Sequence, residues 1–238
     1  LTLPYIVRVI GVEKYGAVAF ALTTVQYIVI LSTYGFQYSA TKAISVNREN
    51  TEKINHIFSA VLTLKALFSF TFSLLYLLFI YQIPSLREHH LLYVFALGIP
   101  LGNALLPVWL FQGLEKMNLI LMPNLISKSL MVVCIFSFIN DKEDYIFISL
   151  MHGISFVLSG IIGVYIAIYK LRIKFSLPSK HFFVLTLKDG LHIFLSTIGI
   201  NLYRNANIFL LGVMTNNMLV GYYASAEKII KALQATIA

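Results

Sequence analysis

The chain has 238 residues, of which 58% are hydrophobic and only 12% are charged, with a net charge of +8. Soluble domains average about 45–50% apolar and about 25% charged residues, so a soluble globule of this size could not bury so much apolar surface. The apolar content also excludes intrinsic disorder, and the single cysteine excludes a disulfide scaffold. The composition therefore predicts an integral membrane protein.

The chain has 18 basic and 10 acidic residues, and this basic excess bears on how the chain is oriented in the membrane. A basic excess can indicate nucleic-acid binding, but such binding needs a solvated basic surface with stacking aromatic side chains. Here the basic residues are scattered between apolar blocks. We therefore expect no nucleic-acid partner and attribute the excess to positive-inside topology.

Uncharged stretches divide the chain into candidate membrane spans. Four of them run for 21 to 27 residues, and about 20 apolar residues cross the hydrocarbon core as a helix. Because the chain opens on Leu1 within an apolar run and shows no signal-peptide pattern, we expect an incomplete first helix. We predict an all-α polytopic membrane protein with eight transmembrane helices, at about 1–10, 16–38, 57–80, 91–112, 118–139, 145–169, 191–214 and 218–238.

The loops between these helices fall into two alternating sets of unequal charge. The set at 39–56, 113–117 and 170–190 holds nine Lys and Arg residues, and the other set holds three. The positive-inside rule places the first set and the N-terminus in the cytoplasm. The longest and most basic loop is the best internal boundary, and it predicts a unit over 1–171, a cytoplasmic linker over 172–190 and two helices over 191–238.

A short pattern recurs on the two sides of this boundary. Residues 16–21 and 221–226 both read G-x-x-A-x-A, and a Gly-Val pair precedes each copy. The two copies open predicted helices that lie six apart in the chain. This spacing is typical of a duplicated transporter.

Basic side chains within the predicted spans are the candidate functional residues. They outnumber the acidic ones there by five, and charges inside a bilayer are costly and usually face a cavity or a partner. The surplus favours an aqueous cavity for an anionic ligand, although long side chains can instead reach the membrane interface. The candidates for a cationic, substrate-binding cavity are Arg204, Lys65, Lys128, Lys228 and Lys231.

Depth in the membrane separates these candidates. Arg204 lies eleven residues beyond Ile193, roughly 16 Å along a helix and about the middle of a 30 Å core, which favours the cavity. For Lys65 and Lys128 both interpretations stay open. Glu227 and Lys231 are spaced to pair on one helix face, which leaves Lys228 without an obvious partner.

Prolines and small residues within the spans have a structural interpretation that is at least as good as a functional one. Pro100 and Pro107 predict a bent fourth helix, either a hinge for transport or a static kink. Ser155, Ser159 and Gly163 form a small-x-x-x-small stripe, which predicts close helix packing. We find no metal-binding, nucleophile or phosphate-loop motif, so we expect no metal, no cofactor and no enzymatic activity.

Several segments resemble a known family. They are Leu3-Pro4-Tyr5-Ile6-Val7-Arg8-Val9-Ile10-Gly11, Tyr34-Gly35-Phe36 through Ser39-Ala40-Thr41-Lys42, Pro107-Val108-Trp109-Leu110-Phe111-Gln112-Gly113-Leu114-Glu115-Lys116-Met117, and Gly221-Tyr222-Tyr223 through Ala226-Glu227-Lys228-Ile229-Ile230. In this order they resemble segments of bacterial O-antigen (polysaccharide repeat-unit) flippases of the multidrug/oligosaccharidyl-lipid/polysaccharide exporter superfamily.

The resemblance implies twelve helices in two six-helix lobes around a central cavity, of which this chain would supply the first lobe and two helices of the second. It implies alternating-access transport of an undecaprenyl-pyrophosphate-linked oligosaccharide from the cytoplasmic to the periplasmic leaflet of the bacterial inner membrane. Membrane lipids, a polysaccharide polymerase and a chain-length regulator are the implied partners. The resemblance assigns no binding residue, so the role of Arg204 rests on the charge argument.

Two other functions fit the composition. A multidrug cation antiporter would share the superfamily fold but would need acidic residues in its cavity, where the spans offer only Glu227. A membrane-embedded polysaccharide polymerase would need a catalytic loop or an acidic base at the membrane surface, and the predicted exterior loops are short. A scaffold without transport activity also fits the sequence.

Overall fold

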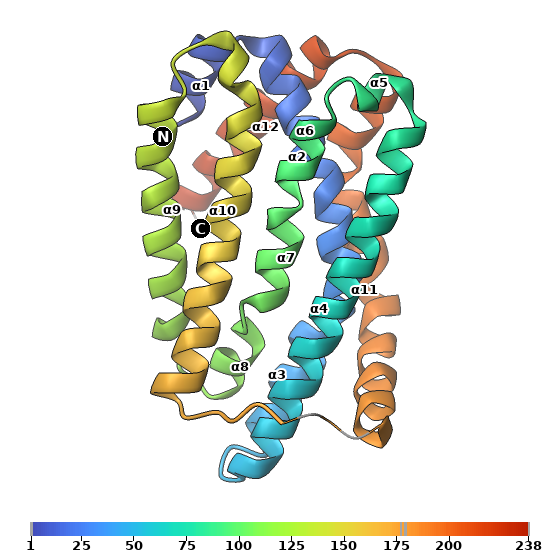
Figure 1. Ribbon diagram of the computed structural model, residues 1–238, viewed down its shortest axis with the longest axis vertical. Helices are drawn as coiled ribbons and strands as arrows, with labels where there is room; N and C mark the ends of the chain where they lie inside the picture. The colour runs from blue at the N-terminus through green and yellow to red at the C-terminus, as the bar shows by residue number, and fades with distance from the viewer. Residues whose placement is uncertain (1, 177, 179, 238) are drawn as a thin grey trace.

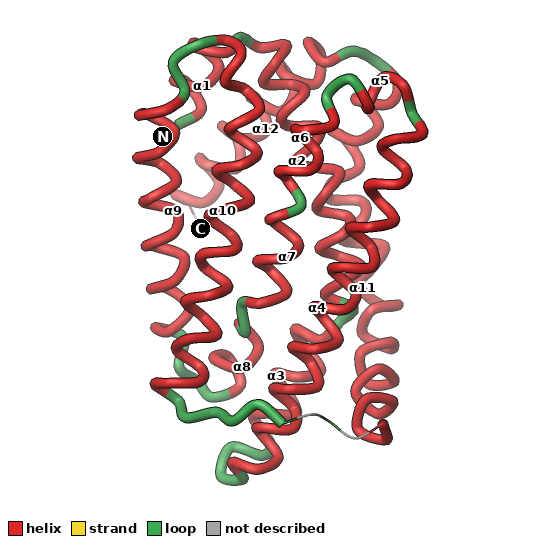
Figure 2. The backbone as a smooth tube through the Cα atoms, viewed as in Figure 1, coloured by secondary structure: helices red, strands yellow, loops and turns green. Residues whose placement is uncertain are grey.

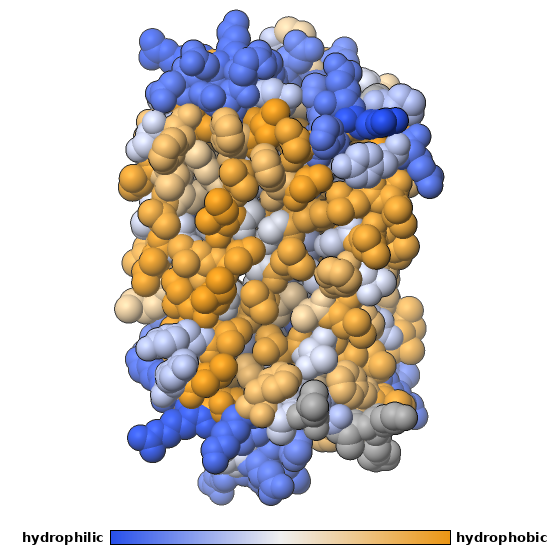
Figure 3. All heavy atoms as spheres, in the orientation of Figure 1, coloured by the Kyte–Doolittle hydropathy of each residue, from blue (hydrophilic) through white to orange (hydrophobic). Residues whose placement is uncertain are grey.

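The computed structural model describes residues 2–176, 178 and 180–237, and its described part is helical with short loops (Figure 2). Within these described residues, six helical stretches are long and apolar enough to cross a membrane, and the long helices stand side by side in one bundle (Figure 1). Hydrophobic residues form a band between two polar ends on the face shown in Figure 3. The prediction of an all-α, multi-pass membrane protein is confirmed.

The helices follow one another along the chain with short connections. In order they are α1 (Leu3–Ile10), α2 (Val12–Thr33), α3 (Phe36–Val46), α4 (Thr51–Gln82), α5 (Pro84–Arg87), α6 (His90–Ala96), α7 (Gly98–Leu105), α8 (Val108–Gly113), α9 (Asn118–Phe138), α10 (Tyr145–Tyr165), α11 (Lys180–Met214) and α12 (Asn217–Ile237). A 3₁₀ turn (Lys142–Asp144) precedes α10, and a π-helical turn (Ile166–Lys170) follows it. Leu1 and Ala238, the outer ends of the predicted first and last helices, lie outside the described residues.

The connections alternate between the two ends of the bundle, as the charge pattern predicts. Residues 47–50 and 114–117 and the segment after α10 lie at one end, which we call the basic end (Figure 1). Residues 83–89, 139–144 and 215–216 lie at the opposite end. The two predicted sets of loops therefore lie on opposite sides of the apolar band.

The second span is longer than predicted and is bent. Gly35 has a φ of +73°, a conformation open to glycine, and it separates α2 from α3. Phe36, Ala40 and Ile44 recur every four residues and are buried, so α3 continues as an amphipathic helix to Val46. The predicted loop at 39–56 is therefore helical except for residues 47–50.

Two breaks interrupt the predicted helix at 91–112. α6 ends before Leu97, and α7 ends before an extended Leu106 that precedes Pro107. The predicted bend is confirmed.

Glycines bring α7 and α10 into close contact. A methyl group added to Gly98 would lie 2.6 Å from the Cα of Gly153, and one added to Gly102 would lie 2.1 Å from the backbone of Phe156. Ser155 and Ser159 of the predicted stripe are buried on the same helix, and Ser159 Oγ donates to Asn124 Oδ1 of α9 at 3.3 Å. The predicted close packing of this helix is confirmed.

The predicted linker at 172–190 is only half a loop. α11 begins at Lys180, because Phe182, Phe183 and Leu187 pack on the core at the basic end and give its first turns a buried side. The preceding segment is tied to α4: the N–H of Lys174 donates to Asn55 Oδ1 at 2.9 Å and that of Ser176 to Ser59 Oγ at 2.9 Å.

Candidate functional site

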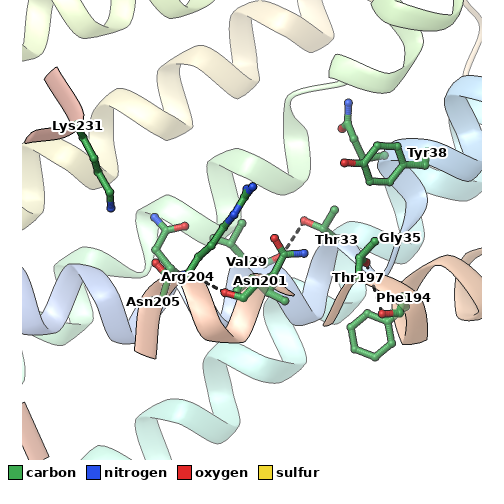
Figure 4. Close-up of a pocket in the computed structure, with 13 residues that line it drawn as sticks. Val29, Thr33, Gly35, Tyr38, Phe194, Thr197, Asn201, Arg204, Asn205 and Lys231 are labelled. Atoms are coloured by element: carbon green, nitrogen blue, oxygen red, sulfur yellow. Dashed lines mark hydrogen bonds between the residues drawn. The ribbon is translucent and has the colours of Figure 1, made fainter. Parts of the chain in front are cut away.

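A polar cavity of about 660 Å³ lies between α2, α3, α11 and α12 (Figure 4). It therefore lies where the helices before the connecting segment meet those after it. The residues that line it are Gln26, Val29, Ile30, Thr33, Gly35, Gln37, Tyr38, Phe194, Thr197, Asn201, Arg204, Asn205 and Lys231.

Helical periodicity places these side chains on facing walls. α2 contributes residues 26, 29, 30 and 33, and α11 contributes residues 194, 197, 201, 204 and 205, so each helix offers one face. Gly35 lets the two walls approach, because a methyl group there would lie 2.5 Å from the carbonyl oxygen of Gly190. The bend at Gly35 then directs Gln37 and Tyr38 to the cavity from α3.

Arg204 is the cationic residue that sequence depth singled out, and it lines this cavity. In Figure 4 its side chain extends from α11, with Lys231 of α12 on one side and Thr33 and Tyr38 on the other. It is exposed to the cavity, and no carboxylate in the described part of the chain pairs with it. The guanidinium is therefore available to an anion.

The second cation of the cavity is partly neutralised. Lys231 Nζ lies 2.7 Å from Glu227 Oε1 one turn earlier on α12, so the predicted pair is confirmed. Amides supply most of the remaining polarity. The side-chain amide of Asn205 donates to the backbone carbonyl of Asn201 at 3.1 Å, and the Asn201 side chain itself lines the cavity.

The other three cationic candidates do not line this cavity. Lys128 of α9 is exposed and Lys228 of α12 lies with Nζ 6.0 Å from the centroid of the Tyr15 ring. Both are near enough to His152 of α10 to interact with it electrostatically. Lys65 lies inside the bundle, only 3% exposed, with Nζ donating to the carbonyl of Asn103 at 2.9 Å. The structure therefore brings two of the five candidates together.

Sequence reasoning missed the amides of the cavity. Asn201 and Asn205 share a face with Arg204 on a predicted span, and Gln26 and Gln37 lie on the span that opens with the first G-x-x-A-x-A copy. Amides one turn apart beside an arginine near the middle of a predicted span are a usable signal, since polar side chains within spans face a cavity or another helix.

The two G-x-x-A-x-A copies pack against each other at the other half of α2. A methyl group on Gly16 would lie 1.8 Å from the carbonyl oxygen of Asn217, and one on Gly221 would lie 2.1 Å from that of Val12. The helices α2 and α12 thus cross at glycines, toward the opposite end from the loops that define the basic end (Figure 1).

Comparisons with known proteins agree with this picture. A family model described as "Polysaccharide biosynthesis protein" matches residues 1–238. The chain is 29% identical over 237 residues to a protein of Escherichia coli (strain K12) with the printed name "Putative O-antigen transporter", and 28% identical over 242 residues to a protein of Shigella dysenteriae with the same name. The match covers the whole of this chain but only 57% and 59% of the length of the two relatives. No solved structure matches the chain.

Proposed function

Because the chain belongs to the polysaccharide biosynthesis protein family, we propose that it is a flippase for a polyprenyl-pyrophosphate-linked oligosaccharide. The cargo would be an O-antigen or similar repeat unit, as the names of the two relatives suggest. It would pass from the cytoplasmic to the periplasmic leaflet of the bacterial inner membrane. The observation that carries the proposal is a polar cavity between helices of an apolar bundle, lined by an arginine that has no carboxylate partner in the described part of the chain.

The cavity suits the head group of such a lipid. A pyrophosphate in a low-dielectric region loses its hydration, and charged donors must replace the lost water. The guanidinium of Arg204 offers a planar fork of donors that matches phosphate oxygens and stays charged. Amides such as Asn201 and Gln26 can bond sugar hydroxyls, while the polyprenyl tail stays in the lipid.

The arrangement of the walls supports alternating access. The cavity lies between two sets of helices, and the crossing of α2 and α12 lies beyond it toward the opposite end. In this proposal the chain contributes the first lobe and two helices of a twelve-helix transporter, with the N-terminus in the cytoplasm. Only 6% of the most apolar part of α11 is buried, which agrees with a helix that packs on further helices of a second lobe.

The remaining candidates would act outside the main cavity. Lys128 and Lys228 stay candidates for a second contact with an anionic head group, because both are cationic side chains within the predicted spans. Pro100, in the first turn of α7, and Pro107, at the break before α8, stay hinge candidates.

A cation antiporter is the less favoured alternative. Such a transporter needs a free carboxylate in its cavity, whereas Glu227 is paired with the lining residue Lys231. A polymerase would need an acidic base at the membrane surface and would itself lengthen chains. In our proposal a polymerase and a chain-length regulator are separate partners that act after transport.

The proposal is tested by locating the lipid-linked repeat unit. In a strain without the protein, we expect repeat units to accumulate on the cytoplasmic leaflet, where a lectin added to inverted vesicles can reach them. Restoring the protein should move them to the other leaflet. Equal distribution between the leaflets in both strains would contradict a flippase, and formation of longer chains by the purified protein would favour the polymerase.

A further inference from the structure

Pro107 leaves one carbonyl of the fourth span without its helical partner. In a continuous helix the N–H of residue 107 would bond to the carbonyl of residue 103, and proline has no N–H. α7 accordingly ends at Leu105, and Leu106 is extended before α8 begins. The Nζ of Lys65 on α4 donates to the freed carbonyl of Asn103 at 2.9 Å.

Lys65 has little else to bond. Its side chain is buried, and no carboxylate of the described residues pairs with it. On the same face of α4, the hydroxyls of Ser69 and Ser73 are buried without a hydrogen-bond partner. Burying a lysine is costly unless its donors are used, so the bond to Asn103 is the contact that specifies where this side chain lies.

The helix beyond the break supports a wall of the cavity. Gly113 at the end of α8 packs closely on Ile44 of α3, and the Arg48 Nε donates to the carbonyl of Gly113 at 2.8 Å. Gln37 of α3, which lines the cavity, donates from its amide to that of Gln112 on α8. A short series of contacts therefore leads from Lys65 through the break to the cavity wall.

We propose that Lys65 is a positioning residue: by bonding the carbonyl that Pro107 frees, it fixes the break between α7 and α8 and so holds α3 at the cavity wall. It acts on transport through Gln37 and Tyr38 and does not touch the substrate. The assignment of the cavity to substrate rests on the proposed function, but the bond and the position of the wall can be measured without any substrate.

The test uses Lys65→Met, Pro107→Ala and the double variant in the full-length protein, with Cys134→Ser and a reporter Tyr38→Cys. We expect Lys65→Met to lower the apparent Tm in detergent by about 2–4 °C, because it leaves a buried carbonyl unsatisfied in a protein of this size. It should change the rate of maleimide labelling at residue 38 by about threefold to tenfold, the factor that the loss of one hydrogen bond gives.

Pro107→Ala provides the decisive comparison, because it supplies the missing N–H to the same carbonyl. In the Lys65→Met background it should recover most of the lost Tm, so that the two effects are not additive. Labelling at residue 38 and export should stay altered, because a straightened helix moves α8 away from α3.

Two matched controls complete the design. Ser69→Ala lies one turn along the buried face of α4 and should leave the labelling rate unchanged. Pro123→Ala removes a proline inside α9 and should not rescue Lys65→Met.

The outcomes separate the two parts of the proposal. If the Tm effects of Lys65→Met and Pro107→Ala are additive, or if Pro123→Ala rescues Lys65→Met, then Lys65 and the residue 107 N–H do not share the Asn103 carbonyl. Unchanged labelling in Lys65→Met, or full recovery of export in the double variant, would overturn the positioning role. These outcomes are distinct from failure of the flippase proposal, which the leaflet assay reports.

Discussion

Removing the guanidinium of Arg204 is the sharpest perturbation of the proposed transport site. α11 ends at Met214, ten residues beyond Arg204, so the arginine lies roughly 15 Å from that helix end. This depth is about half of a 30 Å hydrocarbon core. A head group that crosses the membrane through this cavity would pass the arginine near the midplane, where its hydration is least available.

The size of the effect follows from the bonds lost. Hydrogen bonds to charged groups contribute about 1.5–3 kcal/mol, and about 1.4 kcal/mol corresponds to tenfold in rate. Arg204→Ala should therefore lower export about 10- to 150-fold. Because Arg204 is exposed and pairs with no carboxylate of the described residues, the substitution leaves no buried charge behind, and the protein should still insert and fold.

The measurement is the rate at which lipid-linked repeat units leave the cytoplasmic leaflet in a strain that carries only the variant. Arg204→Lys should keep part of the activity, because the charge remains while the bidentate geometry is lost. Arg87→Ala, at an exposed arginine of the opposite end, is the matched control and should export normally. Wild-type export by a correctly inserted Arg204→Ala protein would refute the reasoning.

Three further predictions address the crossing of α2 and α12, the ion pair between Glu227 and Lys231, and the topology. Gly16→Leu should force α2 and α12 apart, because even a methyl group there would lie 1.8 Å from the carbonyl oxygen of Asn217. Cross-linking of paired cysteines placed on the two helices at this crossing should therefore fall, and unchanged cross-linking would contradict the close contact. Lys231→Ala leaves Glu227 unpaired beside the cavity, so export should fall, and adding Glu227→Gln should recover it; no recovery would show that Lys231 itself is required. Asp141→Cys should react with an impermeant maleimide from the periplasm, and labelling from the cytoplasm alone would reverse the topology.

The membrane spans were predictable because the physics that sets them is local. A stretch without charge and about 20 residues long crosses the bilayer as a helix, whatever its neighbours. Helix ends were harder to predict, because charged residues do not stop a helix that buries one side. α3 and the first turns of α11 both continue through residues expected in loops, since Ile44 and Phe182 find apolar partners.

The candidate site was predictable only where depth along one helix decided the question. Arg204 lies far from either end of its span, and Glu227 and Lys231 are spaced one turn apart on one helix, so both features are written in the sequence. The position of Lys65 depends on which helix lies opposite α4 and on a proline 42 residues later in the chain. A pattern along one segment cannot carry that information.

The segment that follows α10 restricts how far the two groups of helices can separate. Ser176 is bonded to α4, and α11 begins four residues later, so a chain of this length between the two points reaches at most about 14 Å. A tether this short keeps the two groups at a high effective concentration relative to one another, and it leaves them little freedom to part at the basic end. We therefore expect the two groups of helices to rotate about this corner more easily than they separate. An insert of glycine and serine between Ser176 and Lys180 should then change the rate of that rotation and leave the cavity walls as they are.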